Sequence, residues 1–161
     1  MSYSTGSPTQ LATSDRPQVA LAILYQNERC LLQLRDDIPT IAHPGKWAFF
    51  GGHLDPGETP EAGLQRELIE EIGYTPPSVT LFSSYQNDAP VDRHVFYAPL
   101  IVEINSLSLN EGMDMGLASY SEIQAGYCYS PHLREHRPIA YPHQQILLEF
   151  YQSRDRLKLY D

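Results

Sequence analysis

The sequence predicts an α/β fold in which a mixed β-sheet is sandwiched between helices. Two kinds of segment lead to this class: short apolar runs of strand length, and two longer segments whose apolar residues recur at helical spacing. At 161 residues the chain is long enough to bury a core and suits one domain. Strands and two helices within a domain of this size favour a sheet with helices packed against it.

The N-terminal residues 1–17 are expected to form a flexible tail. They are rich in serine, threonine and proline, and they lack the apolar segment of a signal peptide. We therefore expect a single folded domain over residues 18–161.

The first strands are predicted from two apolar runs and one aromatic run. Residues 19–25 and 30–34 flank a short polar turn, which is typical of a β-hairpin. Residues 35–46 contain two prolines and a glycine and are expected to form a loop. Residues 47–50 are then predicted to be a short aromatic strand that stops at the following pair of glycines.

The next segment carries local signals for a helix. Thr59 can act as the N-cap, and Pro60 suits the first helical position. Gly73 can take the left-handed conformation that ends a helix, so the helix is predicted over residues 60–72. At about 100° per residue, one side of this helix is apolar and is expected to face the core. Its members are Ala62, Leu64, Leu68, Ile69 and Ile72.

The remainder of the chain is expected to complete the sheet and add a second helix. Polar and proline-containing stretches are expected to be loops, and an apolar stripe near the C-terminus predicts the helix. The predicted segments are strands 80–86 and 94–103, loops 105–116 and 127–141, a helical turn 120–124 and a helix 143–154.

Charge and composition exclude several classes of protein. The net charge of −9 argues against a nucleic-acid polymer as partner, because phosphate backbones are bound by clusters of lysine and arginine. No stretch approaches the roughly 20 apolar residues that a membrane-spanning helix needs. Two cysteines are too few for a disulfide framework, so we expect a reducing cytoplasmic location.

The acidic residues crowd into the segment that contains the first helix. Glu67, Glu70 and Glu71 share one side of that helix, where like charges repel and raise each other's pKa. Arg66 can relieve part of this repulsion through an i,i+4 pair with Glu70. A solvated helix face is the alternative, but hard oxygen ligands at this spacing favour a site for Mg²⁺ or Mn²⁺.

The same segment resembles the Nudix box, GX5EX7REUXEEXGU. Gly52 is followed after five residues by Glu58, and after seven more by the run REL-IEE-IGY over residues 66–74. Every fixed position matches, and Tyr74 stands where the family usually has an aliphatic residue. The resemblance implies a Nudix-type α/β/α sandwich. It also implies Mg²⁺-dependent hydrolysis, with Mn²⁺ as a substitute, of a diphosphate bond in a nucleoside diphosphate linked to a group X.

The resemblance also assigns roles within the box. Glu67 and Glu71 would bind the metal, with Glu70 close by, and the carbonyl of Gly51 would add a backbone ligand. Arg66 and Glu58 would orient these carboxylates. Gly63 would keep the helix surface low where phosphate approaches.

The group that takes a proton from the attacking water stays open among three carboxylates. Glu67 is one candidate, and Glu111 and Glu122 from later segments are the others.

Residues outside the box are weaker candidates for contact with the substrate. Arg35 opens the loop before the aromatic strand, Phe50 ends that strand, and His53 follows the glycine pair. Turn formation, core packing and a surface position explain these three equally well. Glu111 and Glu122 complete this set.

The substrate class and the partners are left open. ADP-ribose or a nucleotide sugar is one class, and an ordinary or oxidised nucleoside triphosphate is the other. The stretch WAFFGGHLDPGE resembles the oxidised-nucleotide hydrolases of the family. A homodimer also stays open.

Two functions other than hydrolysis are compatible with the same fold. A Nudix-like module can sense a nucleotide metabolite without turnover, and isomerases share the fold. Such modules commonly lose box carboxylates and the isomerases use different metal ligands, so the intact box favours the hydrolase.

Overall fold

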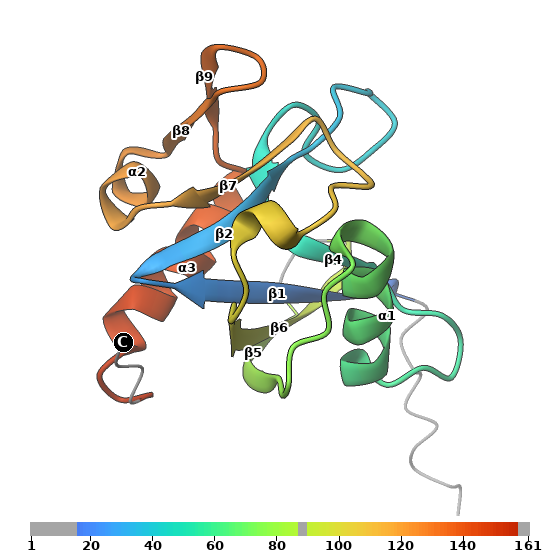
Figure 1. Ribbon diagram of the computed structural model, residues 1–161. Helices are drawn as coiled ribbons and strands as arrows, with labels where there is room; N and C mark the ends of the chain where they lie inside the picture. The colour runs from blue at the N-terminus through green and yellow to red at the C-terminus, as the bar shows by residue number, and fades with distance from the viewer. Residues whose placement is uncertain (1–15, 87–89, 158–161) are drawn as a thin grey trace, which may run out of the picture.

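A computed structural model describes residues 16–86 and 90–157 of the chain. The expected N-terminal tail lies outside these residues, except for Arg16 and Pro17. Within the described residues, a seven-stranded sheet has helices on both faces (Figure 1). A separate two-stranded sheet precedes the C-terminal helix in the chain.

The elements follow one another in the order of their labels. The strands are β1 (Gln18–Gln26), β2 (Arg29–Leu34), β3 (Trp47–Ala48), β4 (Phe50–His53), β5 (Thr80–Tyr85), β6 (Asp92–Pro99), β7 (Asp114–Ala118), β8 (Tyr127–Ser130) and β9 (Glu135–Pro138). The helices are α1 (Pro60–Ile72), α2 (Tyr120–Ala125) and α3 (Tyr141–Ser153), with a 3₁₀ turn at Ile104–Ser106.

Strand β1 is the centre of the large sheet. It runs parallel to β6, and it is antiparallel to β2 at one end and to β4 at the other. The sheet is therefore mixed, as the sequence predicts. In register, Leu21 of β1 lies between Gly51 of β4 and Val95 of β6.

Alternate residues of β1 face two separate cores. Leu21 and Ile23 pack in the core that includes α3, whereas Ala22 and Leu24 pack in the core that includes α1. This alternation follows from the two-residue period of a strand with both faces covered. The predicted α/β/α sandwich is confirmed.

Helix α1 has the predicted bounds and caps. The Thr59 side chain accepts a hydrogen bond from the N–H of Ala62 at 3.2 Å, and Gly73 ends the helix at φ 67°. The predicted core face was wrong in part, because Ala62 and Ile69 are exposed. The helix is rotated so that Glu71 is buried instead, and its acidic side turns toward β4.

The predicted aromatic strand is interrupted at Phe49. The backbone N–H of Phe49 donates to Nδ1 of His143, and its carbonyl accepts from Nε2 of Gln33. Side chains therefore take the place of ladder hydrogen bonds at this residue. The strand also does not stop at the glycines, because Gly51 and Gly52 continue β4 beside β1.

Two segments expected to be loops contain strands. The polar segment 105–116 leads into β7, which pairs with β2, and segment 127–141 contains the β8–β9 hairpin. In β8 two exposed tyrosines alternate with Cys128 and Ser130, which are buried. The other elements differ from their predictions at their ends, most of all β6, which begins two residues early and ends at Pro99.

Candidate active site

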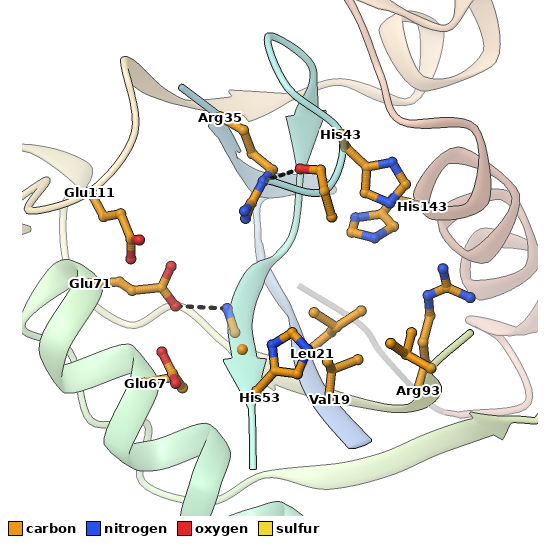
Figure 2. Close-up of a pocket in the computed structure, with 14 residues that line it drawn as sticks. Val19, Leu21, Arg35, His43, His53, Glu67, Glu71, Arg93, Glu111 and His143 are labelled. Carbon is orange, nitrogen blue, oxygen red and sulfur yellow. Dashed lines mark hydrogen bonds between the residues drawn. The ribbon is translucent and has the colours of Figure 1, made fainter. Parts of the chain in front are cut away.

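Segments far apart in the sequence line one cavity of about 320 Å³. Carboxylates from α1 and from residue 111 lie at one end of it, and His43, Arg93 and His143 lie at the other (Figure 2). Val19 and Leu21 of β1 lie between the two ends (Figure 2), and the glycines of β4 also line the cavity. A cavity of this size is in the range of small-molecule sites.

Glu71 is a buried carboxylate in the acidic end. Its side chain accepts hydrogen bonds from the N–H of Gly51 at 2.9 Å and from Nε2 of Gln33 at 3.3 Å. Burial raises the pKa of Glu71 to about 8, and the charges of Glu111 and Glu67 add to this rise. No described lysine, arginine or histidine forms an ion pair with Glu71. A bound cation would supply the missing positive charge.

Glu67 lies against the backbone of Gly52. A Cβ atom at residue 52 would be 2.7 Å from Cδ of Glu67, so any side chain there would force the carboxylate to move. Burial raises the pKa of Glu67, although its ion pair with Arg66 at 3.0 Å acts in the opposite direction. The glycine of the box therefore makes room for this carboxylate.

Arg66 holds the loop before α1 to the helix. Its Nε and Nη2 donate to the two oxygens of Glu58 at 2.8 and 2.9 Å, and Nη2 also donates to the carbonyl of His53. The hydrogen bonds from Arg66 lower the pKa of Glu58 to about 2. The same guanidinium contacts Glu67, so one arginine links the loop and a cavity carboxylate.

Glu70 and Gly63 of the box do not line the cavity. Glu70 forms the predicted i,i+4 pair with Arg66 at 3.5 Å, but its side chain is 59% exposed and does not line the cavity. A Cβ atom at Gly63 would be 2.4 Å from Leu54 and 2.9 Å from Glu58. The small size of Gly63 therefore accommodates the preceding loop rather than a phosphate.

The two later carboxylates have different positions. Glu111 lines the cavity beside Glu71 (Figure 2). Glu122 lies in the first turn of α2, where it forms a capping box with Ser119. It does not line the cavity, so the structure does not bring Glu122 together with the other carboxylates.

Of the three weaker candidates for contact with the substrate, two line the cavity and one does not. Arg35 lines the cavity, and its Nε donates to the carbonyl of Ala42 at 2.6 Å. His53 lies at an exposed edge of the cavity. Phe50 is fully buried in the α1 core, so the expectation of a contact with substrate was wrong for this residue.

Three cavity residues carried no signal in the sequence. His43 comes from the loop after β2, Arg93 from β6 and His143 from the first turn of α3. The two histidine rings lie 5.0 Å apart, and that of His143 stacks on Phe49 at 4.8 Å. Because each of these residues comes from a different and distant segment, no sequence motif links them.

The acidic end fits a hard divalent cation by its donor chemistry. Glu67 and Glu71 offer carboxylate oxygens whose pKa values are raised by burial, and Gly51 lines the cavity beside them. Within the described part of the chain, no three His, Cys, Asp or Glu side chains already lie close enough to hold a metal ion. Magnesium often takes only one or two carboxylates, and completes its shell with water and substrate phosphate.

Comparison with known families agrees with the box and the fold. The sequence model of the NUDIX domain matches residues 15–110, which is more than half of the chain. The chain belongs to the Nudix family. Among the described residues, no helix has the length and apolarity needed to cross a membrane.

Curated Nudix relatives match around the box. An 8-oxo-dGTP diphosphatase of Proteus vulgaris is 49% identical over 51 residues, which is 32% of this chain and 45% of that protein. A nucleoside triphosphatase NudI of Salmonella arizonae is 38% identical over 58 residues, covering 36% and 41% of the two chains. The chain thus spans less than half the length of these relatives.

Solved structures share the fold over most of the chain. The Nudix domain of Shewanella oneidensis NrtR, complexed with ADP ribose, aligns with a TM-score of 0.65 at 20% identity, over 94% of each chain. A MutT protein from Methanosarcina mazei aligns with a TM-score of 0.64 at 19% identity, over 86% of this chain and 96% of that one. At such identities the likeness establishes the fold.

Proposed function

We propose that this chain is a Mg²⁺-dependent Nudix pyrophosphohydrolase that cleaves the diphosphate linkage of a small nucleotide. The observation that carries the proposal is the set of partly or fully buried carboxylates at one end of a nucleotide-sized cavity. Mn²⁺ is expected to substitute for Mg²⁺, because both prefer hard oxygen ligands. Both cysteines are free and buried, which supports the proposed cytoplasmic location.

We assign different roles in this reaction to different residues of the chain. Glu67 and Glu71 would hold the cation, which when bound lowers the pKa of a water and neutralises phosphate oxygens. Arg66 keeps Glu67 oriented, and Glu58 fixes Arg66 in turn. Glu111 or Glu67, which both line the cavity, would take the proton of the attacking water as its oxygen attacks phosphorus.

A nucleoside triphosphate, ordinary or oxidised, is the substrate class that we propose. The relatives that match around the box are named 8-oxo-dGTP diphosphatase and nucleoside triphosphatase. Cleavage between the α- and β-phosphates would give a nucleoside monophosphate and pyrophosphate. ADP-ribose and nucleotide sugars are the competing class, since one structural neighbour binds ADP ribose.

A hydrolysis screen with purified protein and Mg²⁺ tests the proposal. The panel would contain ordinary and oxidised nucleoside triphosphates, ADP-ribose, nucleotide sugars and dinucleoside polyphosphates. Glu71→Gln should abolish the turnover of the active class. Glu103→Gln, which removes an exposed carboxylate outside the cavity, is the matched control and should keep full activity.

The alternative of a binding module predicts a different outcome. Such a protein would bind one compound in a metal-dependent way without releasing phosphate-containing products. Turnover of ADP-ribose alone would keep the hydrolase and overturn the proposed substrate class.

A further inference from the structure

The end of the cavity opposite the carboxylates presents hydrogen-bond donors. Arg93 and His143 both line it, and their side chains point into the space above Val19 and Leu21 (Figure 2). Neither residue belongs to the Nudix box, and neither is needed to hold a cation. We therefore expect Arg93 and His143 to contact the part of the substrate that lies away from the reacting phosphates.

The hydrogen bonding of His143 makes its other nitrogen a donor. Nδ1 accepts the backbone N–H of Phe49 at 3.0 Å, so the proton of the neutral ring is on Nε2. Every enclosed side-chain nitrogen or oxygen of the described residues has a hydrogen-bond partner. No described residue contacts Nε2 by a hydrogen bond, so the small exposed part of the ring includes Nε2–H. This group faces the cavity.

Arg93 is a partly buried cation whose donors are free for a ligand. Its side chain forms no hydrogen bond or ion pair with another described residue. Burial lowers the pKa of Arg93, yet a guanidinium stays charged at neutral pH and offers N–H donors without any acceptor. A fixed donor array of this kind recognises groups that accept hydrogen bonds.

The surface beside these donors suits a flat apolar ring. Val19 is the register partner of Arg93 in the parallel β1–β6 pair, so the two side chains lie on the same face of the sheet. Leu21 and Val91 continue this wall. A nucleobase could lie on the aliphatic side chains with its edge toward the donors.

We propose that Arg93 and His143 select nucleobases with a keto oxygen at the recognised edge, such as guanine, hypoxanthine or uracil. An amino group at that position, as in adenine or cytosine, would direct its own N–H toward Arg93 and leave both donors unmatched. Arginine paired with guanine is a known example of this complementarity. The inference rests on the proposed function and names the base that the same site accepts.

A phosphate group is the competing ligand for Arg93, and the cavity favours it less. His143 is held neutral by its hydrogen bond, so Arg93 would face the phosphate without a second cation from α3. Val19, Leu21 and Val91 would bury phosphate oxygens against aliphatic groups, which is costly. A nucleobase would instead lay its apolar ring on these aliphatic side chains and direct the hydrogen-bond acceptors of its edge toward Arg93 and His143.

Two pairs of matched nucleotides test the proposal. ITP and ATP differ at position 6 of the purine and in the proton at N1, and UTP and CTP differ in the same way at position 4 and N3 of the pyrimidine. We expect kcat/KM to be roughly 10- to 100-fold higher for the keto member of each pair. Binding of IMP and AMP, measured by calorimetry, should show the same preference without any turnover.

Arg93→Gln should bring both ratios close to one, because an amide can donate or accept. Arg29→Gln makes the same change of charge at an exposed arginine of β2 and should leave the ratios unchanged. His143→Asn keeps an acceptor for Phe49 but removes the Nε2–H donor, and it should lower the ratios as well.

The outcomes separate the two proposals. Equal turnover within each pair, with equal or no binding of IMP and AMP, would overturn base selection and leave the hydrolase standing. Preferred binding of IMP without turnover of any nucleotide would support base selection and overturn the proposed hydrolase. A uniform loss for all four nucleotides in Arg93→Gln would assign Arg93 to a shared phosphate and overturn the inference.

Discussion

Gly52 and Glu67 pack so closely that a side chain at residue 52 would displace the Glu67 carboxylate. A Cβ atom at residue 52 would lie 2.7 to 2.9 Å from three atoms of the Glu67 carboxylate. Gly52 belongs to β4 and Glu67 to α1, so this contact sets the carboxylate against the strand. The position of a proposed metal ligand therefore depends on the absence of a side chain 15 residues earlier.

Gly52→Ala should displace Glu67 and impair catalysis. We expect kcat to fall about 100-fold, since a shift near 1 Å in a reacting group can have this effect. Gly116→Ala is a matched control in β7, where the added Cβ would meet Trp47 at an ordinary 3.8 Å. Steady-state rates of both variants check the prediction, and equal activity would contradict it.

Glu111→Gln and Glu122→Gln should separate two candidates for the base. Glu111 lines the cavity, so its amide variant is expected to lower kcat about 10- to 100-fold. Glu122 caps α2 with Ser119, and glutamine can serve in the same capping box. Glu122→Gln should therefore leave kcat unchanged. A larger loss in Glu122→Gln would show that the base had been misassigned.

Glu58→Gln should weaken catalysis through Arg66. The carboxylate of Glu58 accepts two hydrogen bonds from the guanidinium, and an amide oxygen can replace only one of the acceptors. Partners that orient metal ligands typically change activity or metal affinity 10- to 100-fold. We expect a fall in kcat and in Mg²⁺ affinity, with KM for the nucleotide little changed. A change in KM alone would point to direct contact with substrate.

His143 should make the protein less stable in mild acid. Burial lowers the pKa of His143 well below its usual value of 6.5, and the charges of His43, Arg93 and Arg35 lower it further. The unfolded chain therefore binds a proton that the folded chain excludes, so stability is present above pH 6.5 and is lost as the pH falls.

The slope that His143 contributes can reach about 1.4 kcal/mol per pH unit below 6.5. Urea unfolding of the metal-free protein between pH 7 and 5 measures it. The His143→Asn variant should show a smaller slope, with His43 left to titrate. An unchanged slope would exclude His143 as a source of the acid sensitivity.

Local signals explain what the sequence predicted well. The bounds of α1 followed from Thr59, Pro60 and Gly73, because capping depends on residues within one turn of the helix end. Two carboxylates of the cavity, Glu67 and Glu71, followed from the box for the same reason, since both lie on one helix. Glu111 comes from a later segment outside the box. The local sequence did not predict how α1 is rotated about its axis. Ile69 was predicted to face the core but is exposed, because the packing of the helix against the sheet decides which side is covered.

Non-local contacts explain what the sequence did not predict. β7 is only five residues long and contains a glycine, and it forms a strand by pairing with β2. Arg93 and His143 meet because β6 and α3 pack around β1, and a lone arginine or histidine has no spacing to detect. The break at Phe49 likewise depends on His143, which lies 94 residues later in the chain.

The Mg²⁺ dependence of nucleoside triphosphate hydrolysis in wild type and Glu71→Gln tests the central claim most directly. We expect saturable activation by Mg²⁺, release of nucleoside monophosphate and pyrophosphate, and a loss of about 100- to 1,000-fold in the variant, equivalent to several kcal/mol of metal assistance. Turnover that persists in excess chelator, or equal rates for the two proteins, would contradict a metal held by Glu71.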